Sequence, residues 1–287
     1  MTQRRRLQTQ REKSRDLGML DVPYLILTLL LVAVGLIMLF SASYARAYYL
    51  TGNSARYFTS QLVFAALGTV VMLLVSRVPY RWYEKCNWLI LAAATVLLVL
   101  VLVIGTNSNG ATRWINLGFT SLQPSEIAKY ALILTLAWYY QKYEAKAFDF
   151  KNKRNSNLYG TIFPLCIIGL VCGLVMLEKH LSGIIIIGAI GLMVMFASGI
   201  RLKLLGLFGV AAGACVTAIA LLTDYTKRRI DIWLNPAAHP QDGGWQTLQG
   251  MRAIGSGGFF GLGLGNSRQK FSYVSQPQND FIYTIVC

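Results

Sequence analysis

The sequence predicts an all-α polytopic membrane protein with seven transmembrane helices, the start of an eighth, and a large extracellular loop between helices 7 and 8. Apolar residues make up 55% of the 287 residues, and the mean hydropathy is +0.48. Only 14% are charged, against about 25% in ordinary soluble domains. The apolar residues also fall in long runs separated by short polar segments. These observations exclude an ordinary cytosolic enzyme, a disordered chain and a nucleic-acid-binding protein.

The expected transmembrane helices follow from the length of each apolar run, because a helix needs about 20 mostly apolar residues to cross the hydrocarbon. The expected spans are 22–44, 58–75, 88–104, 124–138, 159–176, 181–198 and 204–222. An eighth apolar run, 281–287, rises only about 10 Å as a helix, so we expect the chain to stop inside its eighth span.

This pattern divides the chain into four parts. They are a basic cytoplasmic tail (1–21), transmembrane helices 1–7 (22–222), a large extracytoplasmic loop with amphipathic segments (223–280) and the start of helix 8 (281–287).

The lysine and arginine residues predict the orientation of the chain. Sixteen of them lie in the N-terminal tail and in the second, fourth and sixth loops, whereas the first, third and fifth loops carry only four. Since short cytoplasmic loops carry the excess of these residues, we expect the N-terminus in the cytoplasm. The net charge of +15 is then explained by topology, without nucleic acid.

Acid–base chemistry on the outer face must draw on the acidic and imidazole side chains predicted to lie there. Asp280 stands where the polar loop meets the eighth apolar run. A helix dipole stabilises a carboxylate at such a position, and partial desolvation raises its pKa, as a general base requires. A plain helix N-cap is the alternative interpretation. The full set of candidates is Glu126, Glu178, Asp224, Asp231, Asp242, Asp280, His180 and His239.

Two further features lie at the predicted outer ends of the spans. The segment Gln123-Pro124-Ser125-Glu126 is typical of a helix start. Glu126 and Lys129 share a face of that helix at i, i+3, either as functional groups or as a structural pair. The pair Arg113-Trp114 suits binding of a pyrophosphate or a sugar, and equally an aromatic anchor with a cation at the membrane interface.

The loop 223–280 carries two kinds of segment. The stretch 228–234, which begins with Arg228 and Arg229, mixes cations with aromatic and aliphatic residues and suits an interfacial amphipathic helix. The glycine-rich stretches 255–258 and 261–266 predict a tightly turning re-entrant loop. They follow no strand of a βαβ unit, so a dinucleotide site is rejected. No spacing of cysteine and histidine residues predicts a metal site.

Taken together, these segments resemble the SEDS family of bacterial cell-wall proteins, which includes FtsW, RodA and SpoVE relatives. The resemblance rests on ordered motifs, namely 109–118, 122–129, 228–230, 234–236, 253–261, 263–265 and 279–282. It implies a ten-helix membrane glycosyltransferase that polymerises lipid II into glycan strands of peptidoglycan during cell division, elongation or sporulation. It also implies a class B penicillin-binding protein, a transpeptidase, as a partner.

The resemblance assigns roles to particular residues. The family's general base corresponds to Asp280 and its important tryptophan to Trp114. Its polar helix start corresponds to Gln123, Ser125, Glu126 and Lys129. Cations are needed to bind the substrate diphosphate, and Arg113, Lys129, Arg228, Arg229 or a divalent ion (Mg or Mn) are the candidates.

Two departures from the family pattern keep alternatives open. Val274-Ser275-Gln276-Pro277-Gln278-Asn279 replaces the family's Leu-Pro-Glu-Pro-His-Thr before the aspartate, and Lys179-His180 replaces its Pro-Asp after Glu178. The alternatives to the enzyme are a lipid II transporter (flippase) and a non-catalytic scaffold for a transpeptidase. The near absence of charge within the predicted spans argues against the transporter.

Overall fold

The computed structural model describes residues 20–108, 111–118, 120–149, 152–222, 224–241, 243–258, 261–263, 265–267, 279 and 281–286. The expected cytoplasmic tail, except for its last two residues, lies outside this part of the chain. The chain forms two compact units, which are described separately. Unit 1 comprises residues 1–78 and 220–287, and unit 2 comprises residues 79–219.

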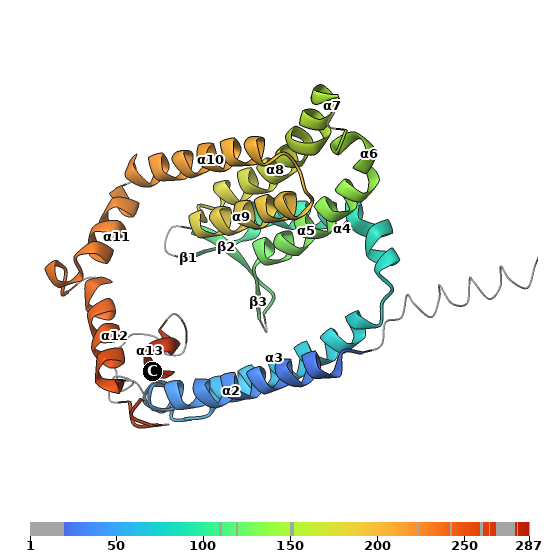
Figure 1. The fold of residues 1–287 in the computed structure, drawn as a ribbon. Helices are drawn as coiled ribbons and strands as arrows, with labels where there is room; N and C mark the ends of the chain where they lie inside the picture. The colour runs from blue at the N-terminus through green and yellow to red at the C-terminus, as the bar shows by residue number, and fades with distance from the viewer. Residues whose placement is uncertain are drawn as a thin grey trace, which may run out of the picture. The chain divides into compact units, whose positions relative to one another are not determined.

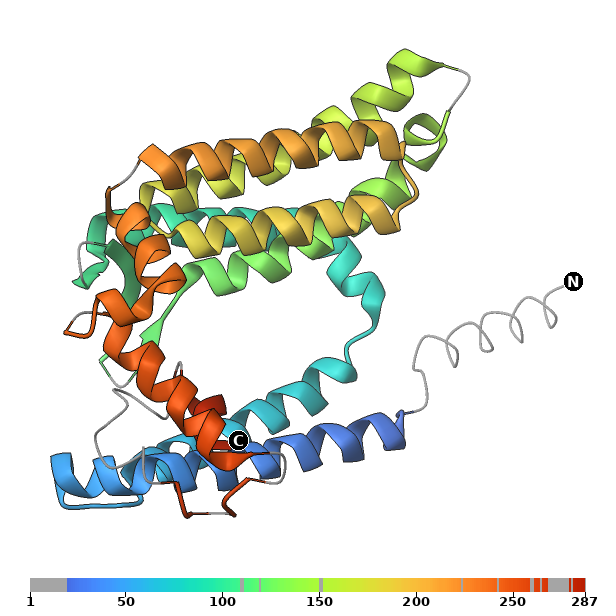
Figure 2. The same cartoon turned by 60° about the vertical axis from the view of Figure 1, so that its left-hand side comes forward.

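Unit 1 is built on two long apolar helices that lie side by side in Figures 1 and 2, α2 (Val22–Thr51) and α3 (Arg56–Ser76). The Asp21 side chain caps α2 by accepting a hydrogen bond from the Tyr24 N–H at 3.0 Å. Gly52 ends α2 with a φ of 71°, a left-handed conformation that favours glycine. The two helices therefore form a tight hairpin.

The loop 223–280 contributes the remaining elements of unit 1. They are α11 (Asp224–Leu234), η2 (Pro236–Ala238) and α12 (Gly243–Gly257), and the segment after the loop forms α13 (Ile282–Val286). The helix expected over 228–234 is present as the C-terminal part of α11. The re-entrant loop expected over 255–258 is wrong, because Gly255 and Gly257 continue α12.

The segment 255–257 is helical because α12 packs along one of its faces. Gln249, Gly250 and Ala253 are buried. A side chain at residue 250 would lie 3.1–3.2 Å from Phe281 and Thr284, so α13 packs directly on this glycine. These contacts offset the roughly 0.5–1 kcal/mol that each helical glycine costs. The helix then ends at Gly258, whose φ is +59°.

Unit 2 contains four helices that pack on one another, α4 (Tyr80–Ile104), α5 (Pro124–Lys142), α8 (Phe163–Leu177) and α9 (Leu181–Ala197). Their buried core includes Leu98, Leu132 and Ile187. Gly191 of α9 faces Ile168 of α8 so closely that an added Cβ would lie 2.6 Å from the Ile168 Cδ1. The short helix α6 (Glu144–Ala147) follows α5, and α10 (Leu202–Leu222) follows α9.

One turn of π-helix, η1 (Leu158–Ile162), joins α7 (Lys153–Asn157) to α8. The Tyr139 hydroxyl donates to the Tyr159 carbonyl at 3.0 Å, and the Tyr140 hydroxyl donates to the Gly160 carbonyl at 2.8 Å. Because π turns loosen the regular backbone ladder, these tyrosines of α5 fix the wide turn in place.

A small antiparallel sheet connects α4 to α5, where the sequence had predicted only a loop. Its strands are β1 (Thr106–Ser108), β2 (Ala111–Asn116) and β3 (Ser121–Leu122), with β2 in the centre. Ile115 opposes Leu122 and is buried. The sheet therefore fixes the position of β2 beside the start of α5.

The described residues include four helical stretches long and apolar enough to cross a membrane, which are Val22–Thr51, Arg56–Ser76, Tyr80–Ile104 and Lys153–Leu177. The apolar helix Leu181–Ala197 is shorter. The structure is mostly helical, as expected, and the count of seven spans stays a prediction.

Candidate functional site

The candidate site in unit 2 begins on strand β2, which carries Arg113 and Trp114. The Arg113 Nη2 donates a hydrogen bond to the backbone carbonyl of Lys179 at 3.2 Å, across 66 residues of sequence. Its buried Nε finds no hydrogen-bond partner among the described residues. Trp114 is 39% exposed. The strand thus brings a guanidinium to the turn between α8 and α9.

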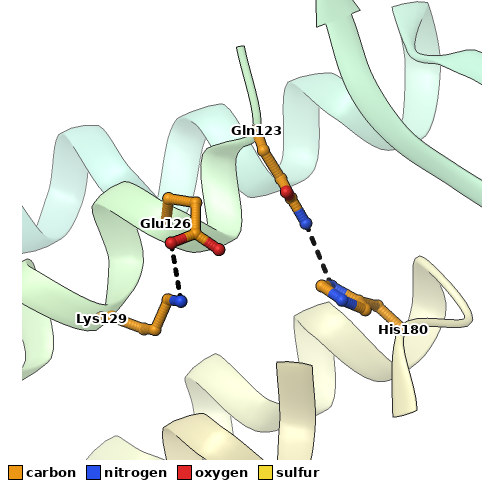
Figure 3. Close-up of polar contacts among 4 residues, drawn as sticks. All are labelled: Gln123, Glu126, Lys129 and His180. Carbon is orange, nitrogen blue, oxygen red and sulfur yellow. Dashed lines mark hydrogen bonds and ion pairs between the residues drawn. The ribbon is translucent and has the colours of Figure 1, made fainter. Parts of the chain in front are cut away.

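The start of α5 supplies the second group of polar side chains. Pro124 is the first residue of the helix and Glu126 lies in its first turn, as the sequence predicted. The Lys129 Nζ lies 2.7 Å from the Glu126 Oε2, which confirms that the two share a face (Figure 3). Ser125 is buried, and its hydroxyl has no hydrogen-bond partner within the described residues.

The turn between α8 and α9 supplies the third group, Glu178, Lys179 and His180. The His180 Nδ1 lies 3.5 Å from the Gln123 Nε2, and Figure 3 shows this contact beside the Glu126–Lys129 pair. Lys179 adopts a left-handed conformation with a φ of 56°, which is uncommon outside glycine. The turn is closed by a hydrogen bond from the Lys179 N–H to the Met176 carbonyl at 3.0 Å.

Glu178 is the most deeply buried ionisable residue of this cluster. Its exposed fraction is 0%, and neither carboxylate oxygen has a hydrogen-bond partner in the described part of the chain. Burial raises the pKa of Glu178 to about 7, although the charge of Arg113 acts in the opposite direction. Burial and then the positive charge of Arg113 lower the pKa of His180.

We call these residues the outer cluster, after the face of the membrane on which the sequence predicts them; they are Arg113, Gln123, Glu126, Lys129, Glu178 and His180. The sequence had singled out the first four as site residues. The sequence indicates Glu178 and His180 only as candidates for acid–base chemistry. They stand where the sequence departs from the family pattern, and that departure is the sequence feature that points to them. The structure brings all six to one end of unit 2.

The remaining predicted site residues belong to unit 1. Arg228 and Arg229 lie on α11, and both side chains are exposed. On the same helix, the Asp231 Oδ2 lies 2.9 Å from the His239 Nε2. The outer cluster lies in unit 2, and α11 lies in unit 1.

Asp280 itself lies outside the described residues, but its neighbours Asn279 and Ile282 are described. Both line a groove of about 690 Å³ between α2 and α3 in unit 1. Leu29, Leu36 and Phe64 are among its apolar lining residues, and its polar lining residues include Thr28, Ser60 and Gln61. Residues on either side of position 280 in the sequence therefore border a mostly apolar groove.

The described residues do not provide a set of side-chain ligands for a divalent cation. No three carboxylate, imidazole or thiol groups come together among the described residues. Asp242 and Asp280 lie outside them. A role for Mg or Mn therefore stays a prediction.

Comparison with known proteins identifies the family to which the chain belongs. The family model described as cell cycle protein FtsW/RodA/SpoVE matches residues 22–287. The chain belongs to this family. The described residues include four helices long and apolar enough to cross a membrane, and together with the family match they indicate a multi-pass membrane protein.

Several relatives are identical to this chain at about a third of the aligned positions. A probable peptidoglycan glycosyltransferase FtsW of Coxiella burnetii is 35% identical, over 93% of this chain and 70% of the relative. Stage V sporulation protein E of Bacillus subtilis is 35% identical, over 93% of this chain and 71% of the relative.

Solved structures show the same relationship. The rod shape determining protein RodA of Thermus thermophilus matches with a TM-score of 0.55 and 27% identity, over 67% of this chain and 58% of RodA. A peptidoglycan synthase complex, described as coordinating polymerization and crosslinking, matches with a TM-score of 0.62 and 29% identity. That match covers 83% of this chain and 66% of the other.

Proposed function

We propose that this FtsW/RodA/SpoVE protein is a peptidoglycan glycosyltransferase that polymerises lipid II into glycan strands. The observation that carries the proposal is the match of the family model over residues 22–287, with relatives named as peptidoglycan glycosyltransferases. The outer cluster supports it, because a polar, charged group at one end of apolar helices suits a substrate that is both lipid and sugar diphosphate.

In the proposed reaction, Asp280 accepts the proton of the acceptor sugar's 4-hydroxyl. That oxygen attacks the anomeric carbon of the lipid-linked donor sugar, and the configuration inverts. The bond from the anomeric carbon to the diphosphate oxygen breaks, and undecaprenyl diphosphate leaves. A positioned general base contributes about 10²–10⁴-fold to such a step.

Charge on the leaving diphosphate needs positive groups near it. Arg113 and Lys129 of the outer cluster are assigned this role in unit 2, and Arg228 and Arg229 are assigned to it from α11. The amide of Gln123 and the hydroxyl of Ser125 are assigned to hydrogen bonds with the substrate, and Trp114 to packing against a sugar ring.

The proposal extends to location and partner. The N-terminus lies in the cytoplasm, and the site faces the outer side of the bacterial plasma membrane. A class B penicillin-binding protein cross-links the strands that this protein polymerises. The structural match to a peptidoglycan synthase complex supports such a partner.

Substitution of the general base tests the proposal. In the full-length protein, Asp280→Ala should lower polymerisation of lipid II by about 10²–10⁴-fold, measured as glycan strands on a gel. Asp231→Asn, in the same loop but on α11, is the matched control and should retain most activity. Normal strand yield from Asp280→Ala would overturn the assignment.

The same variant separates the alternatives. Movement of labelled lipid II across vesicle membranes that is independent of Asp280, without polymerisation, would favour a transporter. Wild-type growth of cells carrying only Asp280→Ala, with the transpeptidase still bound, would favour a scaffold.

A further inference from the structure

Glu178 carries a role that neither the family motifs nor the proposed reaction assigns. It ends α8, its side chain is fully buried, and its two oxygens have no hydrogen-bond partner among the described residues. A buried carboxylate in this state is costly unless a positive charge lies near it. A buried carboxylate without a hydrogen-bond partner among the described residues, beside a charged guanidinium, is therefore a candidate functional residue.

The positive charge near Glu178 is Arg113. The next residue after Glu178 is Lys179, whose carbonyl oxygen accepts the hydrogen bond from the Arg113 Nη2 at 3.2 Å. The Arg113 Nε is also buried, without a hydrogen-bond partner in the described residues. The Nη2 of the guanidinium is therefore bound to the α8–α9 turn, whereas its Nε has no acceptor among the described residues.

The conformation of the turn brings these groups together. Lys179 occupies the left-handed region, which costs of the order of 1 kcal/mol or more for a residue other than glycine. This backbone reversal lets Glu178 point into unit 2 while the His180 ring faces Gln123. Gly183 leaves room for the His180 ring in this position, because a Cβ at residue 183 would lie 2.6 Å from the His180 Nδ1.

We propose that Glu178 is a positioning residue, whose charge determines how tightly the Arg113 guanidinium is held at the α8–α9 turn and so how much positive charge it offers to a diphosphate. This inference rests on the proposed function for the identity of the diphosphate. A protonated Glu178 leaves Arg113 free to face the ligand. An ionised Glu178 attracts the guanidinium and neutralises its charge.

The residues around Glu178 single it out as the group whose change of charge would affect Arg113. The charge that acts on Glu178 is Arg113 on β2. Lys179 and His180 follow it in the turn, and Glu126 and Lys129 on α5 act on His180. The helices α8 and α9 carry no other ionisable side chains than the thiols of Cys166 and Cys172. Burial raises the pKa of Glu178 to about 7, so the group changes charge near neutral pH.

The test compares binding of inorganic pyrophosphate to the purified full-length protein and to Glu178→Gln, from about pH 6 to about pH 8.5. Gln has nearly the same shape as Glu but stays neutral. At the low end the two proteins should bind alike. At the high end the variant should bind at least roughly tenfold more tightly, because tenfold is the effect of one pair of unit charges about 10 Å apart in an effective dielectric near 25 and pyrophosphate carries several charges.

The ratio of the two affinities at each pH removes the ionisation of pyrophosphate and of His180, because both proteins share them. Glu178→Asp restores the carboxylate and should recover a pH-dependent affinity. Glu144→Gln, an exposed glutamate on α6, is the matched control and should follow the wild type throughout.

An affinity ratio for Glu178→Gln that is constant from low to high pH would overturn the inference. So would a variant whose affinity falls equally at every pH together with its melting temperature, since that result indicates a purely structural role. Loss of polymerisation is not the readout, so failure here is distinguishable from failure of the proposed function, which the Asp280 variants test.

Discussion

Replacement of Gly183 by alanine perturbs the outer cluster without disturbing the helix that carries it. A Cβ at residue 183 would lie 2.6 Å from the His180 Nδ1 and 2.9 Å from its Cε1. Ordinary van der Waals contact begins near 3.4 Å. The ring must therefore move by about 0.8 Å, which breaks its 3.5 Å contact with the Gln123 amide.

Two opposing contributions set the stability of Gly183→Ala. An off-rotamer histidine side chain costs about 0.5–1.5 kcal/mol, whereas replacing a helical glycine by alanine gains about 0.5–1 kcal/mol. The net change should be within about 1 kcal/mol. A displacement of this size at a functional site should nevertheless lower polymerisation by roughly tenfold to a hundredfold.

Strand synthesis from lipid II and thermal unfolding in detergent measure the two effects. Gly188→Ala is the control on the same helix, because nothing lies within 4 Å of its added Cβ. His180→Ala removes the ring, so adding Gly183→Ala to it should cause no further loss. An equal loss from Gly183→Ala with and without His180 would refute the reasoning.

Two further predictions concern stability. Because the pKa of Glu178 is about 7 in the folded protein and near 4.5 when exposed, its contribution to stability is fully present below about pH 4.5 and is lost as the pH rises through 7. At pH 8 the free energy of unfolding of Glu178→Gln should therefore exceed that of the wild type by up to about 3 kcal/mol, and its melting temperature should be higher. An equal or lower melting temperature at pH 8 would contradict this. Gly191→Ala should cost about 1–3 kcal/mol through its overlap with Ile168; Ile168→Ala should relieve part of that cost, and a melting temperature unchanged by Gly191→Ala alone would contradict the packing.

The features of the site that depend on neighbouring residues could be predicted from the sequence. The helix start at Pro124 and the Glu126–Lys129 pair follow from local rules, because proline favours the first turn and residues at i, i+3 share a face. The seven expected apolar runs likewise correspond to helices, since hydropathy is a property of each segment.

The features that depend on tertiary contacts could not be predicted in the same way. The meeting of Arg113 with the Lys179 carbonyl joins residues 66 positions apart and needs a left-handed Lys179. The sheet around β2 and the continuation of α12 through Gly255 both depend on packing against other elements. Local propensity favours a loop in each case, and tertiary contacts override it.

The π turn η1 contains one more residue than an α-helical turn would need. Successive residues of an α-helix are about 100° apart around its axis. Deleting a single residue from 158–162 would therefore let the backbone return to a regular ladder and rotate α8 by about that angle. Ile168, Val171 and Val175, which are buried in unit 2, would swing away from α5 and α9. The length of this short segment thus sets which side of α8 faces inward.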